Sequence, residues 1–142
     1  MSEHYFTASP AVEAEERAHR FTIRGVEHAV VTASGVFSAD RLDKGTQVLF
    51  DHVPDPPKTG TFLDLGCGWG PITLALAGAA PGATVLATDV NERSLALTAR
   101  NAAAAGLDNV RTSQAEALLA ELRQTSTPVD LIWSNPPVRI GK

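Results

Sequence analysis

Three short segments of this chain combine residue types that could bind a nucleotide-like ligand and an amine. The segment Asp64-Leu-Gly-Cys-Gly-Trp-Gly70 joins a carboxylate to a glycine-rich loop, Asp89 stands 25 residues after Asp64, and Ser134-Asn-Pro-Pro137 lies close to the end of the sequence. Each segment ends an apolar, strand-like run. Because glycine lets the backbone approach a ligand closely, the first segment predicts a ligand-binding loop.

The loop glycines Gly66, Gly68 and Gly70 stand between a predicted strand and a helix that begins with Pro71. The helix N-terminus would face the same place, which favours a nucleotide-like ligand. Asp64 indicates a cationic or hydroxyl-bearing part of that ligand, because a carboxylate repels a pyrophosphate. Two alternatives are a tight turn without a ligand and an NAD site, although the NAD pattern would need glycine in place of Pro71.

Two acidic residues follow the next two predicted strands. Asp89 could accept hydrogen bonds from both hydroxyls of a ribose. Its alternative role, capping the following helix, is already offered by Asn91. Glu116 could accept a hydrogen bond from an adenine amino group, and it equally fits a favourable acidic residue in the first turn of a helix.

The Asn-Pro-Pro segment offers acceptors for an amine. Pro136 and Pro137 lack backbone N–H donors, so the Asn135 side-chain oxygen and the Pro136 carbonyl have no local partner. A planar NH2 group would satisfy both acceptors and, so held, could aim its lone pair at an electrophilic methyl group. The exocyclic amines of guanine and adenine and the side-chain amide of glutamine all fit. A simple turn after an edge strand would explain the prolines but not the asparagine.

The elements that position these residues alternate between strands and helices. Helices are predicted between four apolar strands, which lie at 61–65, 83–89, 109–113 and 129–133. This alternation predicts an α/β fold with a doubly wound, Rossmann-like parallel sheet. Ligands of such sheets bind at the carboxyl ends of the strands, where the informative residues fall.

The proline-rich stretch 53–60 predicts a linker between two parts of the chain. The part at 1–57 is expected to be an appendage with a β-hairpin around Gly25 and a short helix capped by Asp43 or by nearby polar residues. The part at 58–142 is expected to be the ligand-binding core with its first four strands.

Composition limits the class of protein. The 142 residues are 44% hydrophobic with one cysteine, which predicts a single soluble domain in a reducing, cytoplasmic compartment. No apolar run approaches the roughly 20 residues of a membrane span, so no membrane association is expected. The net charge is −4, with five Lys/Arg against nine Asp/Glu in residues 1–57, which argues against tight nonspecific nucleic-acid binding. The four histidines show no metal-ligand spacing, so no metal is expected.

Together these motifs resemble class I S-adenosylmethionine-dependent methyltransferases. More narrowly, the sequence is similar to the methyltransferase small domain group in Ser2-Glu-His-Tyr5, in Gly35-Val-Phe-Ser38 with Asp43-Lys-Gly-Thr46, and in Asn135-Pro-Pro-Val-Arg-Ile-Gly-Lys142. That group includes guanine-N2 methyltransferases of small-subunit ribosomal RNA. The resemblance implies S-adenosyl-L-methionine as cofactor, ribosomal RNA or a ribosomal subunit as substrate, and a place in rRNA processing. The oligomeric state stays open.

The resemblance also implies roles for individual residues. Asp64 would face the methionine amino group, Asp89 the ribose hydroxyls and Glu116 the adenine, while Asn135 and Pro136 would receive the target amine. The three loop glycines would line the methionine and ribose portion of the cofactor. These roles make Asn135 and Pro136 the expected catalytic residues.

The sequence departs from the family at two points. Related enzymes often carry an aromatic residue where this chain has Val138, so stacking on the substrate base would fall to Phe37 or Arg139. The alternative for Phe37 is a place in the hydrophobic core. Family members also continue with further strands, so the fourth predicted strand is expected to be an exposed edge and the chain a fragment of a longer protein. A noncatalytic RNA- or partner-binding module with this fold is the alternative function.

Overall fold

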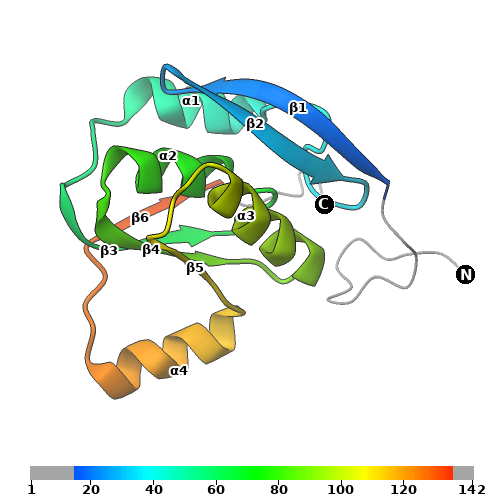
Figure 1. The fold of residues 1–142 in the computed structure, drawn as a ribbon. Helices are drawn as coiled ribbons and strands as arrows, with labels where there is room; N and C mark the ends of the chain where they lie inside the picture. The colour runs from blue at the N-terminus through cyan, green and yellow to red at the C-terminus, as the bar shows by residue number, and fades with distance from the viewer. Residues whose placement is uncertain (1–14, 136–142) are drawn as a thin grey trace, which may run out of the picture.

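The computed structural model describes residues 15–135 (Figure 1). The helices and strands in chain order are β1 (Glu16–Ile23), β2 (Val26–Ala33), α1 (Lys44–His52), β3 (Thr59–Leu65), α2 (Pro71–Ala79), β4 (Gly82–Thr88), α3 (Glu92–Ala104), β5 (Val110–Thr112), α4 (Ala115–Thr125) and β6 (Leu131–Ser134).

A four-stranded parallel sheet forms the centre of the fold, in the order β5-β4-β3-β6. All four predicted strands are present, and a helix follows each of β3, β4 and β5. This confirms the α/β fold and its Rossmann-like parallel sheet. Parallel strands joined by helical crossovers are buried on both faces, which is why the central residues 62–63 of β3 and 85–87 of β4 are apolar and buried.

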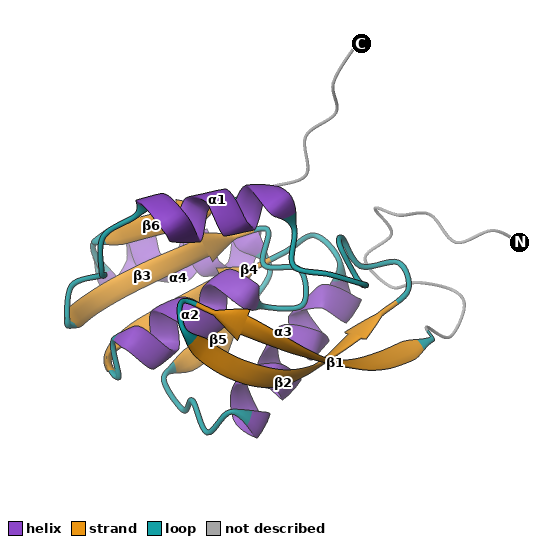
Figure 2. Ribbon diagram, turned by 90° about the horizontal axis from the view of Figure 1, so that it is seen from above, coloured by secondary structure: helices purple, strands orange, loops and turns teal. Residues whose placement is uncertain are grey.

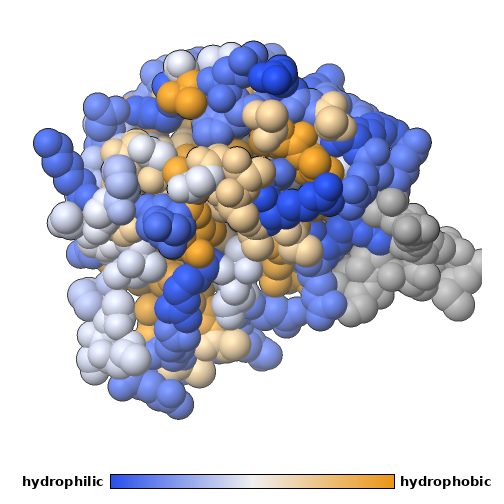
Figure 3. Space-filling view, viewed as in Figure 1, coloured by the Kyte–Doolittle hydropathy of each residue, from blue (hydrophilic) through white to orange (hydrophobic). Residues whose placement is uncertain are grey.

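The two faces of the sheet are covered by different helices (Figure 1). Successive strand residues point to opposite faces, so Phe62 belongs to the larger core with α2 and α3, while Leu63 packs with Leu86 and Leu118 of α4. Hydrophobic residues are visible between the sheet and α4 in the space-filling view (Figure 3). The larger core therefore lies on the α2 and α3 side.

The predicted hairpin forms between β1 and β2, with Ile23 paired to Val26 across the turn at Arg24 and Gly25. It lies over α3, and α1 lies beside it (Figures 1 and 2). The hairpin contributes Ile23 and Val30 to the larger core, and α1 contributes Phe50. The hairpin and α1 thus share one hydrophobic core with the sheet.

The strand order reverses at β3, which has β4 on one side and β6 on the other. A reversal of this kind opens a crevice at the carboxyl ends of the strands. Within residues 15–135 no strand pairs with the outer side of β6, and Ile132 on it is 53% exposed. No helix of this described region is both long and apolar enough to cross a membrane.

Candidate functional site

The glycine-rich loop connects β3 to α2 in a left-handed backbone conformation. Gly66, Gly68 and Gly70 have φ angles of 77°, 58° and 110°, values that L side chains adopt rarely. A Cβ atom on Gly70 would stand 3.2 Å from the Thr98 hydroxyl oxygen. Glycine at these positions lets the loop follow this path without the backbone strain that a side chain would bring.

Two polar side chains of α3 form hydrogen bonds with backbone carbonyls of the loop. The Thr98 hydroxyl donates to the Gly68 carbonyl at 2.9 Å, and the Asn101 side-chain nitrogen donates to the Trp69 carbonyl at 2.9 Å. Asn101 also exchanges hydrogen bonds with the backbone of Val31, at 2.8 and 3.0 Å, which ties the hairpin to the same helix. The sequence interpretation missed both residues. Their signal was polarity on the buried stripe of an amphipathic helix, beside Leu97.

The loop's side chains Trp69 and Cys67 are packing residues. Trp69 is 1% exposed and stacks on Phe21, with ring centroids 5.2 Å apart. Cys67 is buried, and burial raises the pKa of its thiol well above the ordinary value. A thiol held in its neutral form is a poor nucleophile.

Asp64 lies near the end of β3 with its side chain completely buried. One carboxylate oxygen accepts a hydrogen bond from the Thr73 hydroxyl at 2.7 Å, and the other, Oδ1, has no donor within the described residues. Burial is the main cause that raises the pKa of Asp64 to about 7. The fold therefore keeps a buried carboxyl group behind the loop with one oxygen, Oδ1, that has no donor among the described residues.

Asp89 follows β4 directly and joins that strand end to the loop. One oxygen accepts from the Gly68 backbone N–H at 3.0 Å, and the other accepts from the Asn91 backbone N–H at 2.9 Å. The Asn91 side chain caps α3 by accepting from the Arg93 backbone N–H at 2.8 Å. Because Asn91 fills the capping role, the half-buried Asp89 keeps acceptor capacity for a ligand.

Asn135 follows β6 and contacts α1. Its side-chain nitrogen donates to an Asp43 carboxylate oxygen at 2.6 Å and to the Thr46 hydroxyl oxygen at 2.9 Å. Its side-chain oxygen has no hydrogen-bond donor in the part of the chain that the structure describes. Asp43 was predicted only as a helix cap, a role that it also performs by accepting from the Thr46 backbone N–H at 3.2 Å.

The structure brings Asn135 together with the glycine loop and with Phe37. These residues line one small cavity of about 20 Å³, together with Asp43, Thr46, Cys67, Trp69, Pro71, Ile72 and Ser38. Phe37 is half-buried. An aromatic side chain therefore stands beside both the loop and the predicted amine acceptor.

Other predicted site residues lie elsewhere. Glu116 is exposed in the first turn of α4, which follows β5. Pro136, Val138 and Arg139 lie outside the described residues. Among residues 15–135 there is no group of three or more His, Cys, Asp or Glu side chains that could hold a metal ion.

The sheet order sets the order of the site residues along one edge. Glu116 follows β5, Asp89 follows β4, the glycine loop follows β3 and Asn135 follows β6. Neighbouring strands stand about 4.8 Å apart. A ligand lying across these strand ends would meet two carboxylates, then the loop, then a free amide oxygen.

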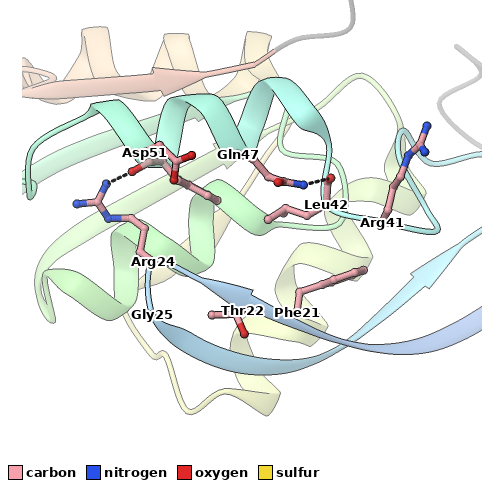
Figure 4. Close-up of a pocket in the computed structure, with 9 residues that line it drawn as sticks. Phe21, Thr22, Arg24, Gly25, Arg41, Leu42, Gln47 and Asp51 are labelled. Carbon is pink, nitrogen blue, oxygen red and sulfur yellow. Dashed lines mark hydrogen bonds between the residues drawn. The ribbon is translucent and has the colours of Figure 1, made fainter.

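A larger groove of about 550 Å³ lies between the hairpin and α1 (Figure 4). The Arg24 guanidinium group on its wall donates to the carbonyls of Phe50 and Val53 at 3.0 and 3.2 Å, so it serves to fasten α1 to the hairpin turn. Arg41 is exposed on the same groove and has no ion-pair partner within the described part of the chain. Arg41 is two residues before Asp43, which contacts Asn135.

Comparison with protein families and related proteins identifies similarity to methyltransferases. The methyltransferase small domain model matches residues 27–142. The uncharacterized protein YbxB of Bacillus subtilis is 37% identical over 142 residues, which cover all of this chain and 70% of that protein. Ribosomal RNA small subunit methyltransferase C of Shewanella loihica is 39% identical over 116 residues, which cover 81% of this chain and 32% of the enzyme.

A solved structure extends this likeness to three dimensions. The T. thermophilus 16S rRNA N2 G1207 methyltransferase, in complex with AdoMet and guanosine, superposes with a TM-score of 0.74 at 27% sequence identity. The match covers 94% of this chain and 36% of that enzyme. This chain therefore spans about a third of the length of the rRNA methyltransferases that it resembles.

Proposed function

This chain belongs to the methyltransferase small domain family, and from that premise we propose that it methylates an exocyclic amine of an RNA base with S-adenosylmethionine. Guanine N2 of small-subunit ribosomal RNA is the target that we propose. The observation that carries the proposal is the order of side chains along the sheet edge, which ends at the free amide oxygen of Asn135. The relative solved with AdoMet and guanosine supports both ligands.

The residues present fit the cofactor. The carboxylate of Asp89 would accept hydrogen bonds from the ribose hydroxyls, and Glu116 would serve the adenine amino group. The unpartnered oxygen of Asp64 fits a cationic ammonium group at the loop. Gly66, Gly68 and Gly70 would let the backbone approach the methionine and ribose portion. When bound, S-adenosylmethionine supplies an electrophilic methyl group on a sulfonium centre.

Asn135 would hold the target amine. Its side-chain oxygen accepts one amine N–H, and the Pro136 carbonyl would accept the other. Positive charge would develop on the nitrogen as it takes the methyl group that the cofactor would supply, and these two acceptors would stabilise that charge. The nitrogen then releases one proton to solvent. Asn135 thus contributes orientation and electrostatic stabilisation without forming a covalent bond itself.

Phe37 would stack on the substrate base. It lines the same cavity as Asn135, and aromatic side chains commonly stack on bases splayed out of an RNA strand. Arg139 is the second stacking candidate, because guanidinium planes also stack on bases. Val138, in the position where related enzymes often carry an aromatic residue, would contact the base without stacking.

The test of this function is methyl transfer with a choice of acceptors. Methyl-labelled S-adenosylmethionine is incubated with the protein and with small ribosomal subunits that lack the modification, and the label is counted in RNA and in protein. Label in RNA is the expected result. Label in protein alone would favour a glutamine side-chain amide, and binding of both ligands without transfer would favour a noncatalytic module.

Asp64 should make both stability and cofactor binding depend on pH. Its pKa in the folded chain is about 7 against an ordinary value of 3.8, so between these values the folded state keeps a proton that the unfolded state has released. The free energy of unfolding should therefore fall as pH rises through this range and level off above about pH 7. The variant Asp64→Asn, measured by denaturant unfolding at several pH values, should lack this component.

Affinity for the cofactor should rise with pH over the range in which the free energy of unfolding falls. An ammonium group at the loop favours the ionised carboxylate, so affinity should rise with pH up to about 7. The other ionisable groups that act on Asp64 are Asp89 and the Cys67 thiol. Below about pH 7, calorimetric titration of Asp64→Asn should give a flat profile of affinity against pH, and a profile as steep as that of the natural chain would exclude Asp64 as its cause.

Arg41 should contribute to RNA binding. An exposed guanidinium group beside the site can contact a phosphate, a contact worth about 1 kcal/mol. Arg41→Ala is therefore expected to raise the KM for ribosomal subunits about fivefold, with kcat unchanged. Arg123→Ala, which removes an exposed cation from the end of α4, is the matched control. Equal KM values for the two variants would remove Arg41 from the substrate path.

A further inference from the structure

We infer that Asp43 and Thr46 are positioning residues that fix the Asn135 amide with its oxygen turned to the substrate. This inference rests on the proposed function, because it assigns the orientation of the group that receives the target amine. It concerns the segment from Asp43 to Thr46 at the start of α1, which no step of the proposed reaction has used so far.

The chemistry of the contacts sets the orientation of the amide. An ionised carboxylate can only accept hydrogen bonds, so the Asn135 atom that faces Asp43 at 2.6 Å must be the nitrogen. The Thr46 hydroxyl oxygen, at 2.9 Å, accepts from the same nitrogen. The amide nitrogen has two protons and meets two acceptors. Its oxygen is left as the one group able to bind a substrate.

The two acceptors are themselves fixed. The Asp43 oxygen that faces Asn135 also accepts from the Thr46 backbone N–H, at 3.2 Å, as the cap of α1. Thr46 is 4% exposed, so its side chain has little freedom to turn away. The helix cap and the amide contact therefore use the same carboxylate oxygen, and forming α1 places both acceptors at once.

Gly45 provides the space for this arrangement. A Cβ atom there would stand 3.0 Å from the Asp43 carboxylate oxygen and 3.1 Å from both polar atoms of the Asn135 amide. These distances are tighter than ordinary van der Waals contacts. Any side chain at position 45 would press on the amide, so the glycine belongs to the same positioning device.

This orientation selects the class of substrate. An outward-facing oxygen binds an N–H donor, whereas a flipped amide would present N–H groups and repel an amine. Carbonyl groups of a base, which only accept hydrogen bonds, find no donor on Asn135. The positioning contacts thus favour exocyclic amines over base carbonyls. A base carbonyl facing the Asn135 oxygen would leave both acceptors without a donor, which costs binding free energy.

The experiment compares Thr46→Val with Thr46→Ser. Valine has nearly the shape of threonine but no hydroxyl group, and serine keeps the hydroxyl. Thr46→Val is expected to lower kcat for methyl transfer about tenfold, the loss that follows when one hydrogen bond to a polar group is removed. Thr46→Ser should stay within about twofold of the natural chain. The melting temperature and the affinity for S-adenosylmethionine should change little in both variants.

A second readout does not depend on activity. Nuclear magnetic resonance follows exchange of the Asn135 side-chain amide protons with solvent, which should be slow in the natural chain and in Thr46→Ser and faster in Thr46→Val. Equal kcat and equal exchange in the two variants would overturn the inference. If the natural chain transfers no methyl group, the proposed function fails, and amide exchange alone decides whether Thr46 fixes Asn135.

Discussion

Replacing Asn135 by alanine is expected to lower the turnover of methyl transfer by about 10²–10³-fold, the effect of losing one preorganised polar group that stabilises developing charge. Among residues 15–135, the side-chain oxygen of Asn135 has no hydrogen-bond donor, and its nitrogen donates only to Asp43 and Thr46. None of these contacts reaches Asp89 or the loop carbonyls. Affinity for S-adenosylmethionine should therefore be nearly unchanged, so the loss should appear in kcat.

Ser134→Ala is the matched control for Asn135→Ala. The Ser134 hydroxyl donates to the Leu65 carbonyl at 2.9 Å, so its loss weakens the same strand end without removing an acceptor for the substrate. This variant should keep turnover within about threefold. Single-turnover kinetics with saturating cofactor measures both. If Asn135→Ala turned over as fast as Ser134→Ala, Asn135 would have no part in the reaction.

Asp89→Ala is expected to weaken cofactor binding by about 1.5–3 kcal/mol, which is roughly a 10- to 150-fold rise in Kd. The carboxylate follows β4 next to the loop, where it would bind the ribose hydroxyls. It also accepts from the backbone N–H groups of Gly68 and Asn91. Part of the effect therefore comes from a less ordered loop, and calorimetric titration with S-adenosylmethionine measures the total.

A charge control and a stability measurement show how much of the change in Kd comes from contact with the cofactor. Asp108→Ala removes an exposed carboxylate after α3, so it changes the net charge equally and should leave Kd unchanged. Thermal unfolding of Asp89→Ala reports how far the loop contacts stabilise the fold. A Kd for Asp89→Ala equal to that of Asp108→Ala would mean that Asp89 does not bind the cofactor.

The parts of the fold that sequence could predict depend on local signals. The strand of Asp64, the left-handed glycines after it and Pro71 at the first position of α2 are all contiguous in the chain, and each has a strong conformational preference. The caps at Asp43 and Asn91 were predictable for the same reason, because a cap acts within three residues. The alternation of strands and helices along the chain then followed from the α/β pattern.

The parts that sequence could not predict depend on contacts between distant segments. Asn135 meets Asp43 across 92 positions, and Asn101 meets Val31 across 70. Both contacts depend on how the hairpin and α1 pack against the sheet, which no local pattern encodes. Phe37 was a stacking candidate only through the family resemblance, and its position beside Asn135 likewise depends on the folding of distant segments.

The most direct test of the proposed reaction is the identity of the methylated nucleoside. Small ribosomal subunits that lack the modification are incubated with the protein and S-adenosylmethionine, their RNA is digested to nucleosides, and the products are identified by mass spectrometry. The account predicts N2-methylguanosine, and its loss with Asn135→Ala. A methyl group on a base carbon, on a ribose hydroxyl or on no nucleoside at all would contradict it, because none of these outcomes needs an acceptor for an exocyclic amine.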